Sequence, residues 1–228
     1  MKFLLTNDDG IAAAGLGALG RAAANLGEAV WVAPHVHLSG CSHRVTTDQP
    51  LRVSQQSQGR WAIEGTPADC VRVGLAHFIP EADWVLSGLN HGGNLGADVH
   101  ISGTVAAVRE GVLHGKPGIA LSHYHKRNLE IDWDRAVRWT TPVLADLIAR
   151  PWAPGTFWNI NLPHLGPDDP EPRVVFCPLE TGPLPLSFRQ EAGLFYYNGN
   201  YHQRPRRPGS DVDVCFSGNI AVTRIAIF

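Results

Sequence analysis

The sequence of 228 residues contains little cysteine, and its thiols are not clustered. The four cysteines are Cys41, Cys70, Cys177 and Cys215. No two of them form a Cys-x-x-Cys pair, so a zinc ribbon and a thioredoxin-type redox site are not supported. Reduced, widely spaced thiols in a chain of this length are typical of the cytosol. We therefore expect a cytoplasmic protein.

The sequence also lacks an excess of charge of either sign. It has 19 basic and 21 acidic residues, which gives a formal net charge of −2. A protein that binds nucleic acid or an anionic membrane through its overall charge is clearly basic, so we expect neither partner. No run of 18 apolar residues is present, which predicts no membrane-spanning helix. The first ten residues reach two acids after a short apolar stretch, unlike a signal peptide.

Hydrophobic residues make up 44% of the chain, and through its first two thirds short apolar runs alternate with helical patterns. The strand-like runs are residues 3–5, 29–33, 83–87 and 118–122, with shorter strands at 51–53 and 61–65. The helical patterns cover residues 11–26, 65–78, 104–114 and 133–149. We expect Pro142 to interrupt the last helix. The alternation predicts an α/β fold with a doubly wound, mostly parallel sheet.

The last third of the chain is rich in proline. Eleven of the 17 prolines lie at or beyond Pro151. Because proline removes a backbone donor and breaks helices, we expect extended strands and an arm in this region. The strand candidates are residues 157–163, 173–178 and 219–228. With no repeat and no linker-like segment, we expect a single domain over 1–228, with a core of about 1–150 and a strand-rich arm over 151–228.

Polar clusters follow three of the expected strands, at residues 6–10, 35–40 and 88–90. Because the carboxyl ends of parallel strands lie at one edge of a doubly wound sheet, we expect these clusters to converge there. Asp8 and Asp9 are adjacent carboxylates, and a bound cation is a common way to keep both ionised. The alternative is a turn that caps a helix, a role that Asp and Asn also favour.

Ser39 and Asn90 belong to the same expected edge, so the possible ligands together are all oxygen atoms. Such ligands suit Mg²⁺, Mn²⁺ or Ca²⁺ better than Zn²⁺. His35 and His37 offer a zinc alternative, because alternate residues of an extended segment share a face. Their spacing to Cys41 matches no standard zinc motif, so histidines that face an anionic substrate are the better interpretation.

Ser102, Gly103 and Thr104 stand at the start of an expected helix. The free N–H groups and the positive dipole end of such a start can bind an anion, although the hydroxyls can also simply cap the helix. Asn94 lies in the glycine-rich segment just upstream, and this position favours phosphate binding. That segment is neither a P-loop nor a Gly-x-Gly-x-x-Gly dinucleotide motif.

Residues 65–70 have the form of a helix start, with Thr66 as the cap, Pro67 at the first helical position and Asp69 three residues after the cap. Cys70 is then a helix residue that is more typically buried than reactive. No Gly-x-Ser-x-Gly elbow is present, so serine and cysteine hydrolase chemistry has little support.

Seven segments, in order along nearly the whole chain, resemble the SurE family of stationary-phase survival proteins, which are metal-dependent nucleotidases. They are TNDDGI (6–11), VAPHVHLSG (32–40), GTPADCV (65–71), SGLNHGGNLGADV (87–99), SGTVAAVREG (102–111), NINLP (159–163) and GSDVDV (209–214). The resemblance implies a Rossmann-like core and a homodimer or homotetramer built partly through the C-terminal region. It implies metal ligation by Asp8, Asp9, Ser39 and Asn90. It also implies phosphate contacts from Asn94, Ser102, Gly103 and Thr104.

Two features depart from the family pattern. The loop before Ser39 usually carries acidic and basic residues, but here it reads His35-Val36-His37-Leu38. The chain also ends at Phe228, where family members often continue into a helix. The first departure bears on the preference for a base, and the second on subunit exchange through that helix.

We therefore expect a phosphomonoesterase that hydrolyses nucleoside 5′- and 3′-monophosphates with one divalent ion per subunit, Mg²⁺ or Mn²⁺, with Ca²⁺ as an alternative. Asp8 and Asp9 are the expected catalytic residues, since they hold the ion and one of them can accept a proton from water. A nucleotide-binding module without turnover and a purely structural scaffold are the two alternatives from other classes.

Overall fold

The computed structural model describes residues 1–126 and 129–228. Strand β1 (Lys2–Thr6) lies in the interior of a nine-stranded sheet, and its apolar residues are buried on both faces. The sheet order is β3 (Val53–Ser57), β4 (Arg60–Ile63), β2 (Glu28–Pro34), β1, β5 (Trp84–His91), β6 (Gly118–His123), β7 (Thr156–Leu162), β11 (Ile220–Ala226) and β8 (Val174–Phe176). From β4 to β7 all neighbours are parallel. The predicted mostly parallel α/β fold is confirmed.

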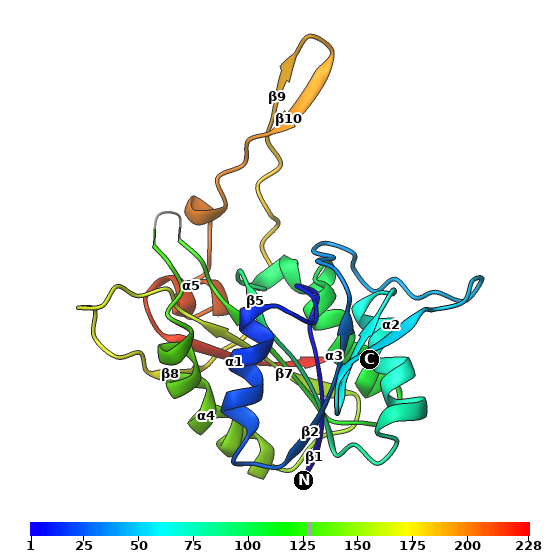
Figure 1. Cartoon of the computed structure of the whole chain (residues 1–228). Helices are drawn as coiled ribbons and strands as arrows, with labels where there is room; N and C mark the ends of the chain where they lie inside the picture. Colours follow the sequence, from blue (N-terminus) through cyan, green and yellow to red (C-terminus); the bar gives the residue numbers. More distant parts are fainter. Residues whose placement is uncertain (127–128) are drawn as a thin grey trace.

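Helices cover both faces of the sheet (Figure 1). Helices α1 (Ala14–Ala23) and α4 (Trp133–Ala149) pack on one face, where Phe3 and Leu5 join their core. Helices α2 (Pro67–Val73) and α3 (Gly103–Leu113) pack on the other face. A π-helical turn at Gly74–Phe78 continues α2. Leu4 contributes to the second core, because successive side chains of a strand point to opposite faces.

The expected interruption of α4 at Pro142 is wrong, because the helix runs unbroken through it. Proline removes one backbone hydrogen bond, but its side chain lies on the exposed surface of the helix. The opposite face of α4 is buried through Trp139, Val143, Leu144 and Leu147. Burial of that face holds the helix together across the missing bond.

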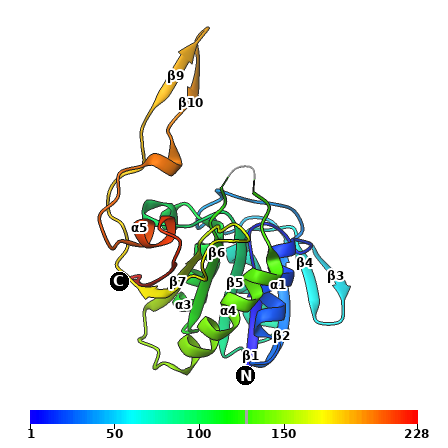
Figure 2. The ribbon, with the colours of Figure 1, turned by 90° about the vertical axis from the view of Figure 1, so that its left-hand side faces the viewer.

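The last third of the chain both completes the sheet and leaves it. Strands β7, β11 and β8 belong to the main sheet, where β11 pairs antiparallel with β7 and parallel with β8. Strands β9 (Phe188–Glu191) and β10 (Leu194–Tyr197) form a separate hairpin. Figures 1 and 2 show this hairpin projecting far from the rest of the molecule. The strands expected in this region are confirmed, but most of them extend the core sheet, and the β9–β10 hairpin alone forms a projecting strand-rich arm.

Several elements were not expected from the sequence. They are β9 and β10, the short helix α5 (Asp211–Phe216), and the 3₁₀ turns Gly96–His100 and Tyr201–Gln203. The strand expected at 51–53 begins instead at Val53 and continues through polar residues to Ser57. It is an edge strand with every residue exposed, so it has no buried face to leave an apolar pattern. Within the described ranges, no helix has the length and apolar character needed to cross a membrane.

Candidate functional site

The site lies where the strand order reverses. Strand β2 pairs with one side of β1 and β5 with the other, so the chain diverges at the carboxyl ends of β1 and β5. Ligands of doubly wound sheets bind at this kind of crevice. Thr6 at the end of β1 is the register partner of Ser87 in β5. The pairing brings the turn at residues 7–9 beside residues 88–90, as the sequence predicts.

The turn after β1 is closed by Asn7. Its side-chain amide donates to the carbonyl of Gly10 at 2.9 Å, and the Gly10 N–H donates to Asn7 Oδ1 at 3.1 Å. The same turn fastens the loop that carries Ser39, because the Leu38 N–H donates to the Asp8 carbonyl at 2.7 Å. Backbone bonds therefore hold the aspartates and the Ser39 loop together.

Asp8 is buried, with 3% of its surface exposed, against the start of α3. Its Oδ1 accepts a short hydrogen bond from the Thr104 hydroxyl. A Cβ on Gly103 would lie 2.9 Å from Asp8 Cβ, so only glycine allows this approach. Burial raises the pKa of the Asp8 carboxyl to about 6, and the neighbouring charge of Asp9 adds to the effect while the Thr104 bond opposes it. A nearby cation would favour the ionised form.

Asp9 faces the adjoining loops. Its Oδ2 accepts from the backbone N–H of His91 at 3.0 Å, and its Oδ1 lies 3.1 Å from His37 Nδ1. A cavity of about 460 Å³ is lined by Asp9 together with Ser39, His37 and His91. Ser39 itself is exposed. Two of the four predicted metal ligands therefore line one cavity directly.

Asn90 comes at the end of β5, which extends to His91 and so includes the first part of the predicted glycine-rich loop. The β5–β6 register shifts between Ser87 and Asn90, and such a bulge re-aims a side chain. Gly88 permits it with a φ of +134°, where a Cβ would lie 2.1 Å from the Leu121 carbonyl oxygen. Asn90 Nδ2 donates to the Gly92 carbonyl at 2.8 Å.

Asn90 Oδ1 is buried and has no hydrogen-bond partner among the described residues. Thr6 Oγ1, Ser87 Oγ and Asn159 Oδ1 are in the same condition, and all four lie on β1, β5 or β7. Buried polar atoms normally find a partner, so a group of unsatisfied oxygens needs an explanation. Thr6 and Asn90 lie at or next to the carboxyl ends of their strands, where a cation or a bound anion with its water would supply the missing interactions. This is the observation in the structure that most directly favours a ligand site.

The predicted phosphate-contacting residues divide into two groups. At the start of α3, Ser102 Oγ accepts from the Val105 N–H at 3.1 Å, so Ser102 caps the helix beside Gly103 and Thr104. Asn94 is buried, and its Nδ2 donates to Ser122 Oγ at 2.8 Å. Whether these residues contact phosphate stays a prediction.

Sequence reasoning gave no role to the side chains that surround Asn94. The Asn94 N–H donates to Asn161 Oδ1 at 2.8 Å, and the Asn94 carbonyl accepts from Asn159 and Asn161. Both asparagines lie on β7 and are fully buried. The available signal was two asparagines at alternate positions of an otherwise apolar strand, since polar side chains are rarely buried without a purpose.

The zinc alternative receives no support from the arrangement of side chains. In the described part of the chain, no group of three or more His, Cys, Asp or Glu side chains could hold a metal ion. His37 lies against Asp9, and His43 instead contacts Glu110 at 2.7 Å.

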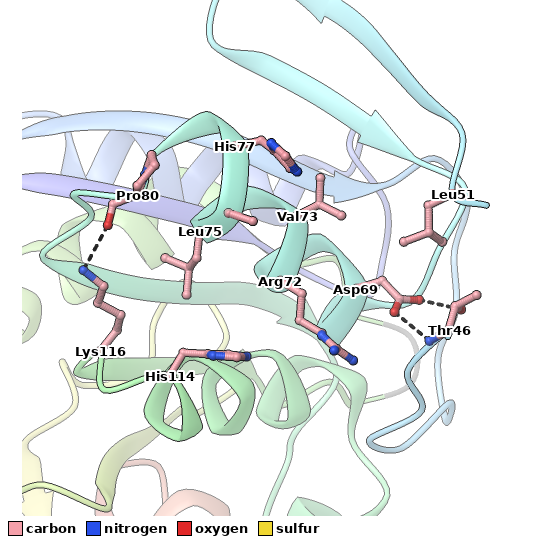
Figure 3. Close-up of a pocket in the computed structure, with 11 residues that line it drawn as sticks. Thr46, Leu51, Asp69, Arg72, Val73, Leu75, His77, Pro80, His114 and Lys116 are labelled. Atoms are coloured by element: carbon pink, nitrogen blue, oxygen red, sulfur yellow. Dashed lines mark hydrogen bonds between the residues drawn. The ribbon is translucent and has the colours of Figure 1, made fainter. Parts of the chain in front are cut away.

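A second cavity, of about 580 Å³, lies over α2 and its π-helical turn (Figure 3). Asp69 stands at its wall, and its carboxylate accepts from the Thr46 N–H, the Thr46 hydroxyl and the Thr66 N–H at 2.8 to 2.9 Å. Thr66 Oγ1 in turn accepts from the Asp69 N–H, which completes a capping box. The predicted helix start is thus confirmed, and Cys70 is buried as expected. The Asp69 carboxylate is satisfied by the protein itself.

Comparisons with known proteins show the family to which this chain belongs. The family model described as "Survival protein SurE" matches residues 3–181. A relative from Synechocystis sp. is 52% identical over 227 residues and covers the whole of both chains. A protein of Allorhizobium ampelinum named 5′-nucleotidase SurE is 38% identical, with 100% of this chain and 92% of the relative covered. The crystal structure of the SurE protein from Aquifex aeolicus superposes with a TM-score of 0.88 at 28% identity, covering 100% of this chain and 94% of the other. This chain therefore belongs to the SurE family.

Proposed function

We propose that the protein is a divalent-metal-dependent phosphomonoesterase that hydrolyses nucleoside 5′- and 3′-monophosphates to nucleoside and phosphate. Membership of the SurE family and the name 5′-nucleotidase SurE of the Allorhizobium relative support the reaction class. The observation that carries the proposal is the buried, unsatisfied Oδ1 of Asn90, whose chain neighbour His91 is hydrogen-bonded to Asp9. Oxygen atoms left open at a strand-end crevice are what an oxygen-ligated ion requires.

Asp8, Asp9, Ser39 and Asn90 would hold the ion, and their all-oxygen chemistry fits Mg²⁺ or Mn²⁺, with Ca²⁺ as an alternative. When bound, such an ion neutralises phosphate charge and lowers the pKa of water. Burial raises the pKa of Asp8 to about 6 in the metal-free protein, and a bound cation would lower it again and keep this ligand ionised. Asp8 and Asp9 are accordingly the proposed catalytic residues.

The start of α3 is the proposed phosphate cradle. Gly103 has no side chain, so the backbone of α3 packs closely against Asp8. The unpaired N–H groups and positive dipole of an 11-residue helix favour a dianion at this position. Ser102, Gly103 and Thr104 would contact the phosphate, and Asn94 would contribute from the adjoining loop.

The assembly we propose is a homodimer or homotetramer. The β9–β10 hairpin exposes large apolar side chains far from the core, among them Phe195 at 68% exposure. Exposed aromatic side chains gathered on one element are typical of an interface. All four cysteines are free, which supports a cytoplasmic location.

The test is phosphate release from a panel of nucleoside 5′- and 3′-monophosphates. The protein is stripped with EDTA, and Mg²⁺, Mn²⁺, Ca²⁺ or Zn²⁺ is then added back. We expect Mg²⁺ or Mn²⁺ to restore release. Restoration by Zn²⁺ alone would move the site towards His35 and His37, and no release with any metal would favour a nucleotide-binding module without turnover.

A further inference from the structure

A wall of aromatic rings stands next to the carboxylate site. The His91 ring lies 4.6 Å from the His125 ring and 6.4 Å from the Trp133 ring, measured between centroids. His125 in turn stacks on His164, with centroids 5.2 Å apart and planes 27° from parallel. His91 is the residue after Asn90, so this wall begins where the proposed metal ligands end.

Two cavities meet at this wall. The cavity of about 460 Å³ that contains Asp9 and Ser39 is also lined by His91 and Trp133. A cavity of about 640 Å³ is lined by His91, Trp133 and His125. His91 and Trp133 line both cavities, and Trp133 shares the first of them with Asp9. A ligand whose charged end lies at Asp9 can therefore place a flat group against Trp133.

The rings are held in position by the fold. The His91 backbone N–H is bound to Asp9 Oδ2 at 3.0 Å. Trp133 is the first residue of α4, whose start is capped by Asp132. The tip of its ring packs on α1 so closely that a Cβ on Gly15 would lie 3.1 Å from it. The wall is thus built on anchored elements. Trp133 is only partly buried and can contact a ligand, whereas Trp139 on the same helix is buried.

We propose that this wall, formed by His91, Trp133 and His125, is the nucleobase subsite of the enzyme. An uncharged heteroaromatic base offers the flat π-face that stacks on such rings, whereas a sugar phosphate alone does not. Stacking tolerates every base, so the wall favours nucleotides over other phosphate esters without selecting one base strongly. The inference rests on the proposed phosphatase function. It places the phosphate of the substrate at Asp9 and the base against Trp133.

The test compares adenosine 5′-monophosphate with ribose 5-phosphate, which has the same phosphate and sugar but no base. Turnover is measured with Mn²⁺ for the full-length wild type, Trp133→Ala and Trp133→Phe. We expect Trp133→Ala to lower kcat/KM for adenosine 5′-monophosphate about tenfold, mainly through KM, and to leave ribose 5-phosphate within about twofold. Trp133→Phe keeps an aromatic face, so we expect its kcat/KM for adenosine 5′-monophosphate to stay close to that of wild type.

Trp152→Ala is the matched control. Trp152 is also partly buried, but it precedes β7 and so lies at the opposite end of the sheet, where its indole N–H donates to the Thr156 carbonyl at 2.8 Å. This variant is expected to leave the ratio of the two substrates unchanged.

The outcomes separate the subsite from the reaction. Equal losses on both substrates in Trp133→Ala, or a wild type that prefers neither substrate, would overturn the subsite while leaving the phosphatase intact. No turnover of either substrate by the wild type would overturn the proposed function. In that case, calorimetry measures the binding of the two compounds to wild type and Trp133→Ala. The subsite predicts that Trp133→Ala binds adenosine 5′-monophosphate more weakly than wild type does, and equal binding would overturn it.

Discussion

Asp8 and Asp69 are both buried beside the start of a helix, yet their surroundings differ. The Asp69 carboxylate lies at the wall of a cavity and accepts three hydrogen bonds from Thr46 and Thr66. Asp8 accepts a side-chain hydrogen bond from Thr104, and burial raises its pKa to about 6. On the strands that form this edge, Asn90 Oδ1 and Thr6 Oγ1 have no partner among the described residues.

The difference separates two networks of polar side chains. In the completed network, Asp69 is hydrogen-bonded to Thr46 and Thr66. In the open network, Asp8 and Asp9 belong with Asn90, whose Oδ1 has no partner among the described residues. A buried polar network that the protein completes itself stabilises the fold. A network left incomplete costs stability unless a bound species completes it, and its free energy of binding then adds to that of folding. Cavity size does not make this distinction, since the larger space over α2 lies next to the completed network.

The largest expected effect is on catalysis, where the two networks should respond differently to the same substitution. Asp9→Asn removes a carboxylate from the open network, and we expect kcat to fall by at least about a thousandfold. Asp8→Ala and Asp9→Ala are expected to abolish turnover in the same way. Phosphate release under saturating Mn²⁺ measures the loss. The matched variant Asp69→Asn should keep kcat within about threefold in the folded protein, and full activity in Asp9→Asn would refute the metal model.

A pH titration of stability sharpens the comparison at His123, which is buried beside the open network. Burial lowers its pKa to about 4, so between about pH 6.5 and 4 the unfolded chain binds a proton that the folded chain does not. Stability is therefore expected to fall as pH falls through this range, by up to about 3 kcal/mol.

The raised pKa of Asp8 acts with the opposite sign, since the folded chain then takes up its proton first as pH falls through about 6. The useful quantity is thus the difference in slope between wild type and His123→Leu in chemical denaturation. We expect His123→Leu to lose less free energy of unfolding than wild type as the pH falls. Identical slopes would show that His123 does not contribute to the pH dependence of stability.

Asp69→Ala is expected to lower the free energy of unfolding by about 2 kcal/mol, because it opens the capping box and leaves the backbone donors of Thr46 and Thr66 unpaired. Urea denaturation gives the value. Unchanged stability would show that the completed network does not stabilise the fold.

The smallest expected change in stability is that of Asn90→Ala. Its Oδ1 has no partner to lose, and its Nδ2 contacts only the Gly92 carbonyl. We expect the metal-free protein to change by less than about 1 kcal/mol, while affinity for Mn²⁺ falls by about tenfold or more. A stability loss as large as that of Asp69→Ala, with Mn²⁺ affinity unchanged, would make Asn90 a structural residue.

The sequence predicts the site because its determinants are local. A buried run such as Phe3–Leu5 identifies a strand, and the rule that parallel strands share one ligand-binding edge brings the following Asp8 and Asp9 near Asn90. Thr66 and Asp69 lie three residues apart, so their capping box is readable from spacing alone. Each of these inferences needs only neighbouring residues or one topological rule.

The features that were missed depend on distant partners or on the absence of burial. Asn159 and Asn161 acquire their role only when β7 places them against Asn94, 65 and 67 residues earlier. The β9–β10 hairpin and β3 bury no face, so hydrophobic periodicity cannot mark them. Pro142 is tolerated because of which side of α4 it occupies, which is decided by packing.

Direct titration with Mn²⁺ tests the central claim that the open network binds a divalent ion and the completed one does not. The protein is stripped with EDTA, and calorimetry counts the ions bound by wild type, Asp9→Asn and Asp69→Asn. The account predicts one Mn²⁺ per chain for wild type and Asp69→Asn, with binding lost in Asp9→Asn. Undiminished binding by Asp9→Asn, or loss of binding in Asp69→Asn while its fold is intact, would contradict it.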